Sequence, residues 1–231
     1  MSGVDDHRQL ARIPLFEGLD EGDFLQLNQR LLRKSFRPGT FIITVEKTGE
    51  LVYMLLEGTV KIFVDQIDGS EVILAFLGAG DTFGEMSLLD SAGRSANVLA
   101  LEQCSCLAMN RMAFGECLRA MPHFSYNLVQ LLTRRLRLAN EQIKALSTLD
   151  VRGRVARQIL AFAQQYGRDD LEDGIRIPLR LTQSDVAALV GASRERVNQV
   201  IVDFKESGFI SVDPTHRISV HQPDALIARF Q

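Results

Sequence analysis

A long stretch without glycine or proline, residues 123–152, limits most strongly how this chain can fold. Within it, apolar residues recur at alternating steps of three and four, the period of an amphipathic helix. The series is Val129, Leu132, Leu136, Ala139, Ile143 and Leu146. So narrow a stripe is typical of a coiled-coil seam. We predict one long helix that pairs with a second copy of the chain through this stripe, giving a homodimer. The alternative is a helix packed only on its own domain.

The residues before this helix form short apolar runs separated by glycine. The candidate strands are residues 41–45, 51–56, 60–64, 72–77, 96–101 and 104–109. Asp68-Gly69 carries the signal of a hairpin turn. Many short strands with such turns favour an antiparallel barrel or roll.

The residues after the helix carry the signals of a helix-turn-helix. Asp150 interrupts the apolar pattern and is predicted to be a hinge, followed by an amphipathic helix over residues 151–166. Thr182 is predicted to cap a second helix. Asp185 follows it three residues later, which is the spacing of a capping box. Gly191 marks the turn that ends this helix.

A third helix and a small hairpin complete this part. Ser193 is predicted to cap a helix that runs to Ser207, with Gly208 as its terminating residue. Strands at residues 209–212 and 217–220 would then form a wing. Helix, turn, helix and wing is the order of a DNA-binding domain.

The third helix has one apolar face and one face suited to reading bases. Four side chains on the polar face can pair with base edges in the major groove, because arginine suits guanine, glutamate suits cytosine, and asparagine or glutamine suits adenine. They are Arg194, Glu195, Asn198 and Gln199. The opposite face is Val197, Val200, Ile201 and Phe204. The alternative is an ordinary solvated polar face.

In the strand-rich part, residues 83–96 place an acid and a base around a short loop of small residues. The fork of Arg94 can donate two hydrogen bonds to a phosphate. Glu85 can accept from a sugar hydroxyl, while amides near Gly84 and the Ser95 hydroxyl can donate to an anion. Taken alone, a glutamate and an arginine nine residues apart are more often an exposed ion pair.

Two segments resemble one known family. Residues 83–96 (FGEMSLLDSAGRSA) resemble the phosphate-binding cassette of cyclic-nucleotide-binding domains. Residues 181–204 (LTQSDVAALVGASRERVNQVIVDF) resemble the helix-turn-helix of the cyclic-AMP receptor proteins, also called catabolite activator proteins. The resemblance extends from Ile13-Pro14-Leu15-Phe16 to the wing and includes the long helix.

The resemblance implies an α+β fold with three parts. These are a cyclic-nucleotide-binding β-roll of jelly-roll type at residues 1–122, a dimerisation helix and hinge at 123–150, and a winged helix-turn-helix at 151–231. By position, Glu85 matches the ribose acceptor, Arg94 and Ser95 the phosphate binders, and Gly84 a backbone contact, with Met86 beside them.

The sequence departs from the family at two places. The family reaches adenine with two adjacent polar residues of the long helix, one of them across the dimer seam, and these positions hold Ala139 and Asn140. Only Asn140 can bond a purine. In the third helix, Arg194 and Glu195 match the base-reading pair, but Gln199 stands where the family often has arginine. The match therefore predicts a GTGA-type DNA half-site. Its inner bases are expected to differ or to vary, because Gln199 replaces the arginine.

Backbone contacts to DNA are expected from hydroxyls, amides at helix N-termini and basic side chains. The candidates are Thr182, Gln183, Ser193 and Arg196. The resemblance also makes RNA polymerase a candidate partner, with the exposed acidic loop at residues 164–174 as its contact.

Composition excludes several classes. The sequence has no apolar run long enough for a membrane span and no signal-peptide pattern, so we expect a cytoplasmic protein without a membrane partner. Its three cysteines are too few for the four that an iron–sulfur cluster needs, and we expect reduced thiols and no metal. The cassette has no nucleophile paired with a base, so we expect no enzyme. The net charge of −3 neither supports nor excludes DNA binding.

Together these features predict a DNA-binding transcription regulator controlled allosterically by a cyclic nucleotide, with cAMP as the favoured effector. The alternative is a regulator of the same fold that needs no ligand, or one that responds to cGMP, a cyclic dinucleotide or a protein partner.

Overall fold

The computed structural model describes residues 10, 13–47, 49–90, 92–170 and 174–230. The first nine residues, Ser91 of the predicted cassette and residues 171–173 of the predicted acidic loop lie outside the described residues. Contacts divide the chain into two compact units, each described by itself below. One comprises Met1–Ile62 with Leu77–Arg137, and the other comprises Phe63–Phe76 with Leu138–Gln231.

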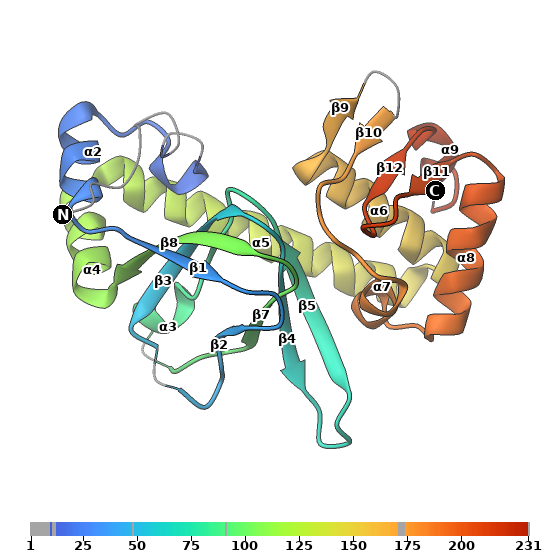
Figure 1. Ribbon diagram of the computed structural model, residues 1–231, viewed down its shortest axis with the longest axis horizontal. Helices are drawn as coiled ribbons and strands as arrows, with labels where there is room; N and C mark the ends of the chain where they lie inside the picture. Colours follow the sequence, from blue (N-terminus) through green and yellow to red (C-terminus); the bar gives the residue numbers. More distant parts are fainter. Residues whose placement is uncertain (1–9, 11–12, 48, 91, 171–173, 231) are drawn as a thin grey trace. The chain divides into compact units, whose positions relative to one another are not determined.

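Short strands dominate the first part of the chain, as the glycine-separated runs predicted. The elements up to the long helix are η1 (Pro14–Phe16), α2 (Glu21–Asn28), β1 (Leu32–Phe36), β2 (Phe41–Ile43), β3 (Leu51–Glu57), β4 (Val60–Asp65), β5 (Glu71–Leu77), β6 (Thr82–Phe83), α3 (Met86–Leu89), β7 (Asn97–Ala100), β8 (Cys104–Asn110) and α4 (Arg111–Ala120). The strands form two four-stranded sheets, in the orders β1-β8-β3-β6 and β2-β7-β4-β5 (Figure 1). The pairs β1–β8, β3–β8, β3–β6 and β2–β7 are antiparallel, which confirms the predicted roll.

The core of the first unit lies between the sheet that contains β3 and β8 and the helices packed on it. Val52 and Met54 of β3 and Leu107 of β8 are fully buried. They pack in one cluster with apolar residues of α2, α4 and the start of the long helix α5, which spans Pro122–Thr148. The ring of Phe124 lies 6.2 Å from Phe16 and 5.5 Å from Phe114, centroid to centroid. The first turns of α5 are therefore fixed to the roll.

Local capping signals define the helices of the second unit. α6 (Val151–Tyr166) begins at Asp150, whose carboxylate accepts from the Gly153 amide. α7 (Gln183–Val190) has the capping box of Thr182 and Asp185 and ends at Gly191, with φ +63°. α8 (Arg194–Glu206) is capped by Ser193. These ends confirm the predicted starts and turn, because each signal acts within a few residues.

The predicted wing hairpin is present, but it belongs to a larger sheet than predicted. The wing strands β11 (Ile210–Val212) and β12 (Ile218–Val220) belong to a four-stranded sheet of order β11-β12-β10-β9. The added strands are β9 (Arg168–Asp170) and β10 (Gly174–Arg176), so the prediction of a loop over residues 164–174 was wrong. α6 runs through the first three of those residues, and β10 pairs with β12 far along the chain. A short helix, α9 (Pro223–Ile227), follows.

Candidate functional site

The second residue of the predicted cassette is a glycine. Gly84 follows β6 with φ +82°, a conformation that favours glycine. A Cβ at this position would lie 2.7 Å from Arg94 Nη1 and 2.9 Å from Ile43. The backbone therefore approaches the arginine more closely than any other residue type would allow. The next residue, Glu85, is the N-cap of the four-residue helix α3.

Arg94 lies inside the cassette, held by backbone and hydroxyl oxygens. Its Nη1 donates to the Gly84 carbonyl at 2.8 Å and to Ser87 Oγ at 3.0 Å, and its Nη2 donates to the Leu51 carbonyl at 2.8 Å. A guanidinium has five N–H donors, so these bonds to described residues leave two for an anion. Burial lowers the pKa of Arg94, while the negative charge of Glu85 opposes that effect. An arginine remains charged at neutral pH in spite of such a shift.

A second glycine makes room for that guanidinium. A Cβ on Gly49 would lie 2.1 Å from Arg94 Nε and 2.7 Å from Ser87 Oγ. Sequence reasoning missed Gly49 and Ser87, because their roles depend on which segments meet in space.

Glu85 is buried and paired with the long helix. Its side chain is 2% exposed, and Oε1 lies 2.6 Å from Nη1 of Arg135 in α5. Arg135 also donates to the carbonyl of Thr82. Sequence reasoning missed Arg135; the available signal was its place one turn before Ala139 on the predicted helix.

Two buried oxygens beside this pair have no hydrogen-bond partner among the described residues. They are Oε2 of Glu85 and Oγ1 of Thr82. A buried polar atom without a partner costs about 1–3 kcal/mol. A ligand hydroxyl could donate a hydrogen bond to the free carboxylate oxygen. The site is therefore suited to a ligand that carries a hydroxyl group close to an anionic group.

The remaining cassette candidates are open to solvent. Met86 is 49% exposed, and Ser95 is exposed with its Oγ 3.8 Å from the Met86 sulfur. Ala139 and Asn140 are exposed on the part of α5 that belongs to the second unit.

The apolar stripe of α5 is largely uncovered. Val129 is 60% exposed, Leu136 and Ile143 are each 63% exposed, and Leu146 is 49% exposed. Ala139 is exposed as well. Only Leu132 is partly buried, because it packs on the core of the first unit. A continuous apolar stripe in water is unfavourable, and such surfaces mark interaction sites.

The recognition-type helix α8 presents its two faces as its periodicity predicts. Its apolar side is buried in the second unit, through Val197, Val200, Ile201 and Phe204. Its base-reading candidates are exposed, namely Arg194, Glu195, Asn198 and Gln199. The N-cap Ser193 accepts from the Arg196 amide at 3.3 Å, and Arg196 Nη1 donates to Gln199 Oε1 at 3.1 Å.

A cavity of about 460 Å³ borders this helix within the second unit. The first turn of α7 lines it with Thr182, Gln183 and Ser184, and α8 contributes Arg194 and Lys205. The wing contributes His216, whose φ is +63°. Lys205 and His216 were not among the sequence candidates, since neither belongs to the base-reading face or to a helix start.

The cysteines are buried and free. Burial is the main reason that the pKa of Cys104 rises to about 11 and that of Cys106 to about 12. Among the described residues, no group of three or more His, Cys, Asp or Glu side chains could hold a metal ion. No helix within the described ranges is both long and apolar enough to cross a membrane.

Comparison with known proteins identifies both parts of the chain. Residues 33–121 match the family model of the cyclic nucleotide-binding domain, and residues 153–229 match the Crp-like helix-turn-helix domain. A CRP-like cAMP-activated global transcriptional regulator of Mycobacterium tuberculosis is 34% identical over 204 residues, covering 88% of this chain and 91% of that protein. The cyclic AMP receptor protein of Thermus thermophilus is 34% identical over 201 residues, covering 87% and 89%.

A solved structure supports the fold. The c-di-GMP responsive global regulator CLP of Xanthomonas campestris aligns with a TM-score of 0.71 at 21% identity, covering 87% of this chain and 100% of that one. The relatives identified by sequence are transcription regulators, not enzymes.

Proposed function

Because this chain belongs to the CRP family of DNA-binding regulators with a cyclic nucleotide-binding domain, we propose that a cyclic nucleotide controls its affinity for DNA. The observation that carries this proposal is the cassette itself: a buried glutamate lies beside an arginine. Among the described residues, one oxygen of that glutamate has no hydrogen-bond partner and the arginine keeps two donors. Glu85 would bind the ribose hydroxyl, and Arg94 with Ser95 would bind the cyclic phosphate. Gly84 and Met86 would line the same site.

Cyclic AMP is the effector that we favour. The M. tuberculosis relative is described as cAMP-activated, and the T. thermophilus relative is a cyclic AMP receptor protein. Asn140 would bond the purine, whereas Ala139 beside it has no polar group. The Xanthomonas regulator is described as c-di-GMP responsive, but its likeness supports the fold alone. Cyclic GMP and cyclic dinucleotides are therefore the alternative effectors that an experiment must compare with cAMP.

The second part of the proposal is operator recognition. Arg194, Glu195, Asn198 and Gln199 are exposed along α8, where a helix in the major groove can read bases. Thr182, Gln183, Ser193 and Arg196 would position the domain on the phosphates. RNA polymerase is a further proposed partner.

The third part is assembly. The exposed stripe of α5 would pair two chains, with residues 1–122 as nucleotide domain, 123–150 as dimerisation helix and hinge, and 151–231 as DNA-binding domain. A regulator of chromosomal DNA would act in the cytoplasm. The Glu85–Arg135 pair connects the cassette to α5, so a ligand that engages Glu85 would act directly on this helix.

Isothermal titration of the full-length protein with cAMP, cGMP and c-di-GMP tests the effector. We expect binding of cAMP at one site per chain and weaker binding of cGMP. Ala139→Thr should raise the preference for cAMP by about 1 kcal/mol, the contribution of one net hydrogen bond. Binding of c-di-GMP alone would replace cAMP as effector, and no binding of any member would favour a ligand-independent regulator.

A further inference from the structure

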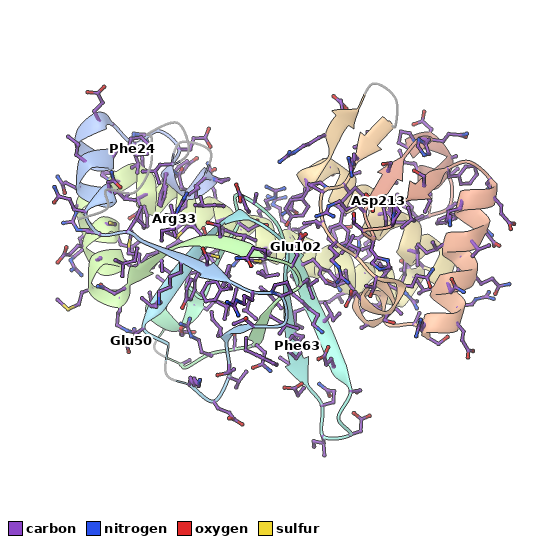
Figure 2. All side chains as sticks on the ribbon, viewed as in Figure 1. Phe24, Arg33, Glu50, Phe63, Glu102 and Asp213 are labelled. Atoms are coloured by element: carbon purple, nitrogen blue, oxygen red, sulfur yellow. The ribbon has the colours of Figure 1, made fainter. Side chains whose placement is uncertain are left out.

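Arg111 lies outside the cassette, at the first residue of α4, yet its side chain reaches into the cassette's supports. Its Nη2 donates to the Ser87 carbonyl at 2.8 Å and to the Gly49 carbonyl at 3.2 Å. Its Nη1 donates to the Leu88 carbonyl at 3.1 Å. Its backbone amide donates to the Glu50 carbonyl at 3.0 Å, and its Nε lies 3.5 Å from the Glu50 carboxylate. Figure 2 labels Glu50.

These contacts stabilise two segments that have little regular structure. The helix α3 has only four residues, so carbonyls near its end lack the partners that a longer helix would supply. Residues 49 and 50 form the irregular link before β3. A planar fork with several donors can hold carbonyls from both segments at once, which an ammonium group does less well.

The same two segments, with Leu51 of β3 directly after the link, surround Arg94. The Leu51 carbonyl and Ser87 Oγ accept from its guanidinium, and Gly49 leaves the space for its Nε. Arg111 therefore fixes the main chain at Ser87 and Gly49 while Arg94 lies against the same residues. Movement of either segment would change where the Arg94 donors point.

We propose that Arg111 is a positioning residue for nucleotide binding: it holds the Gly49–Glu50 link against α3 and so orients Arg94 toward the cyclic phosphate. The inference rests on the proposed function, because it assigns to Arg94 the phosphate of a cyclic nucleotide. Arg111 acts through Arg94 and need not touch the ligand.

A double-mutant cycle tests the proposal on the full-length protein, with cAMP and cGMP as probes, since both carry the cyclic phosphate. The variants are Arg111→Met, Arg94→Leu, the double variant and Arg111→Lys. The control is Arg30→Met, because Arg30 forms a salt bridge with Glu116 at 3.2 Å outside the cassette. Affinity is measured by titration and folding by circular dichroism melts.

We expect Arg111→Met to weaken nucleotide binding about 10-fold, the size of a lost charged hydrogen bond. Arg111→Lys keeps the charge but not the fork and should also bind several-fold more weakly. In the Arg94→Leu background, Arg111→Met should change affinity less than about twofold, because the two residues act as one unit. Arg30→Met should bind as the wild type does.

Two results would overturn the proposal while leaving the proposed function intact. One is a folded Arg111→Met protein that binds the nucleotide with wild-type affinity. If Arg111→Met does not fold, wild-type affinity of Arg111→Lys would be the same contradiction. The other is a double variant whose loss of nucleotide affinity equals the product of the two single losses. That result would mean that Arg111 acts independently of Arg94, as a residue with a general structural role does. A wild type that binds neither nucleotide would instead overturn the proposed function, and this inference with it.

Discussion

At the scale of single residues, Arg94 has the most specific surroundings in the cassette. Three of its hydrogen bonds go to oxygens of the protein, and two glycines make the space it fills. Arg94→Leu should weaken cyclic-nucleotide binding by several kcal/mol, because each charged hydrogen bond to a phosphate contributes about 1.5–3 kcal/mol. Titration calorimetry measures the loss.

The matched control for this change is Arg37→Leu, at an exposed arginine of the same unit. It should leave affinity unchanged. If folded Arg94→Leu binds as tightly as the wild type, the phosphate is bound elsewhere.

Arg194 is the proposed base-reading residue with the clearest single-base prediction. Arg194→Ala should cost about 1–3 kcal/mol per half-site and relax the preference at one base pair, because a bidentate contact to guanine is lost. Selection from random DNA, followed by sequencing, measures that preference. Arg196→Ala is the comparison and should weaken all sequences alike, as loss of a phosphate contact does. An unchanged base preference in Arg194→Ala would remove this residue from the reading face.

At the scale of elements, the wing turn depends on one carboxylate. The carboxylate belongs to Asp213, which Figure 2 labels. It accepts from the amides of Thr215 and Arg217 and from the Thr215 hydroxyl at 2.7–2.9 Å, and from Arg176 at 3.0 Å. Burial would raise the pKa of Asp213, but these donors lower it to about 2. A depressed carboxyl pKa stabilises the fold above the ordinary value near 4, and that stability is lost as pH falls toward 2.

Asp213→Asn should therefore lower the free energy of unfolding at pH 7 by about 1 kcal/mol, a small value because the group is partly solvated. The difference from wild type should shrink as pH falls from about 4 to about 2. Thermal melts across this range check both statements. A difference that does not change with pH would mean that the charge of Asp213 is not what stabilises the turn.

The apolar stripe of α5 gives a prediction about assembly. Leu136→Glu would bring two carboxylates together in the proposed seam, where neither has a partner, so the variant should sediment as a monomer at micromolar concentration. Leu138→Glu is the control, because Leu138 is exposed on the same helix but off the stripe. A dimeric Leu136→Glu protein would move the interface to another surface.

Local signals explain which elements the sequence predicts well. The capping box at Thr182, the left-handed Gly191 and the cap at Ser193 act within one turn of chain, and all three are present. β1 was missed because its sequence, LRKSF, has no clean alternation and acquires strand geometry by pairing with β8. β9 and β10 were missed for the same reason, since β10 depends on β12.

The cassette also has one part that the sequence predicts and one part that it does not. Its own segment is visible in sequence, because Gly84, Glu85 and Arg94 lie within eleven residues. Its partners come from elsewhere: Arg135 from α5, Leu51 from β3 and Arg111 from α4. Such contacts are set by packing of distant segments, which one sequence does not encode as a local pattern.

At the scale of the whole molecule, the proposed function requires coupling between nucleotide binding and DNA binding. The nucleotide would act on α5 through Glu85 and Arg135, and α5 leads to Asp150 and the DNA-binding domain. A dimer binds tightly when its two recognition helices match successive major grooves, about 34 Å apart. Coupling of this kind is reciprocal, so DNA must raise nucleotide affinity by the factor by which nucleotide raises DNA affinity.

Fluorescence anisotropy of a labelled duplex with two GTGA-type half-sites, titrated with protein in the absence and presence of saturating cAMP, tests this claim most directly. We expect DNA binding to be at least about 10-fold tighter with cAMP, within the usual range of allosteric coupling, and Arg94→Leu to show no such gain. Equal DNA affinity with and without cAMP, in a wild type that calorimetry shows to bind the nucleotide, would contradict it.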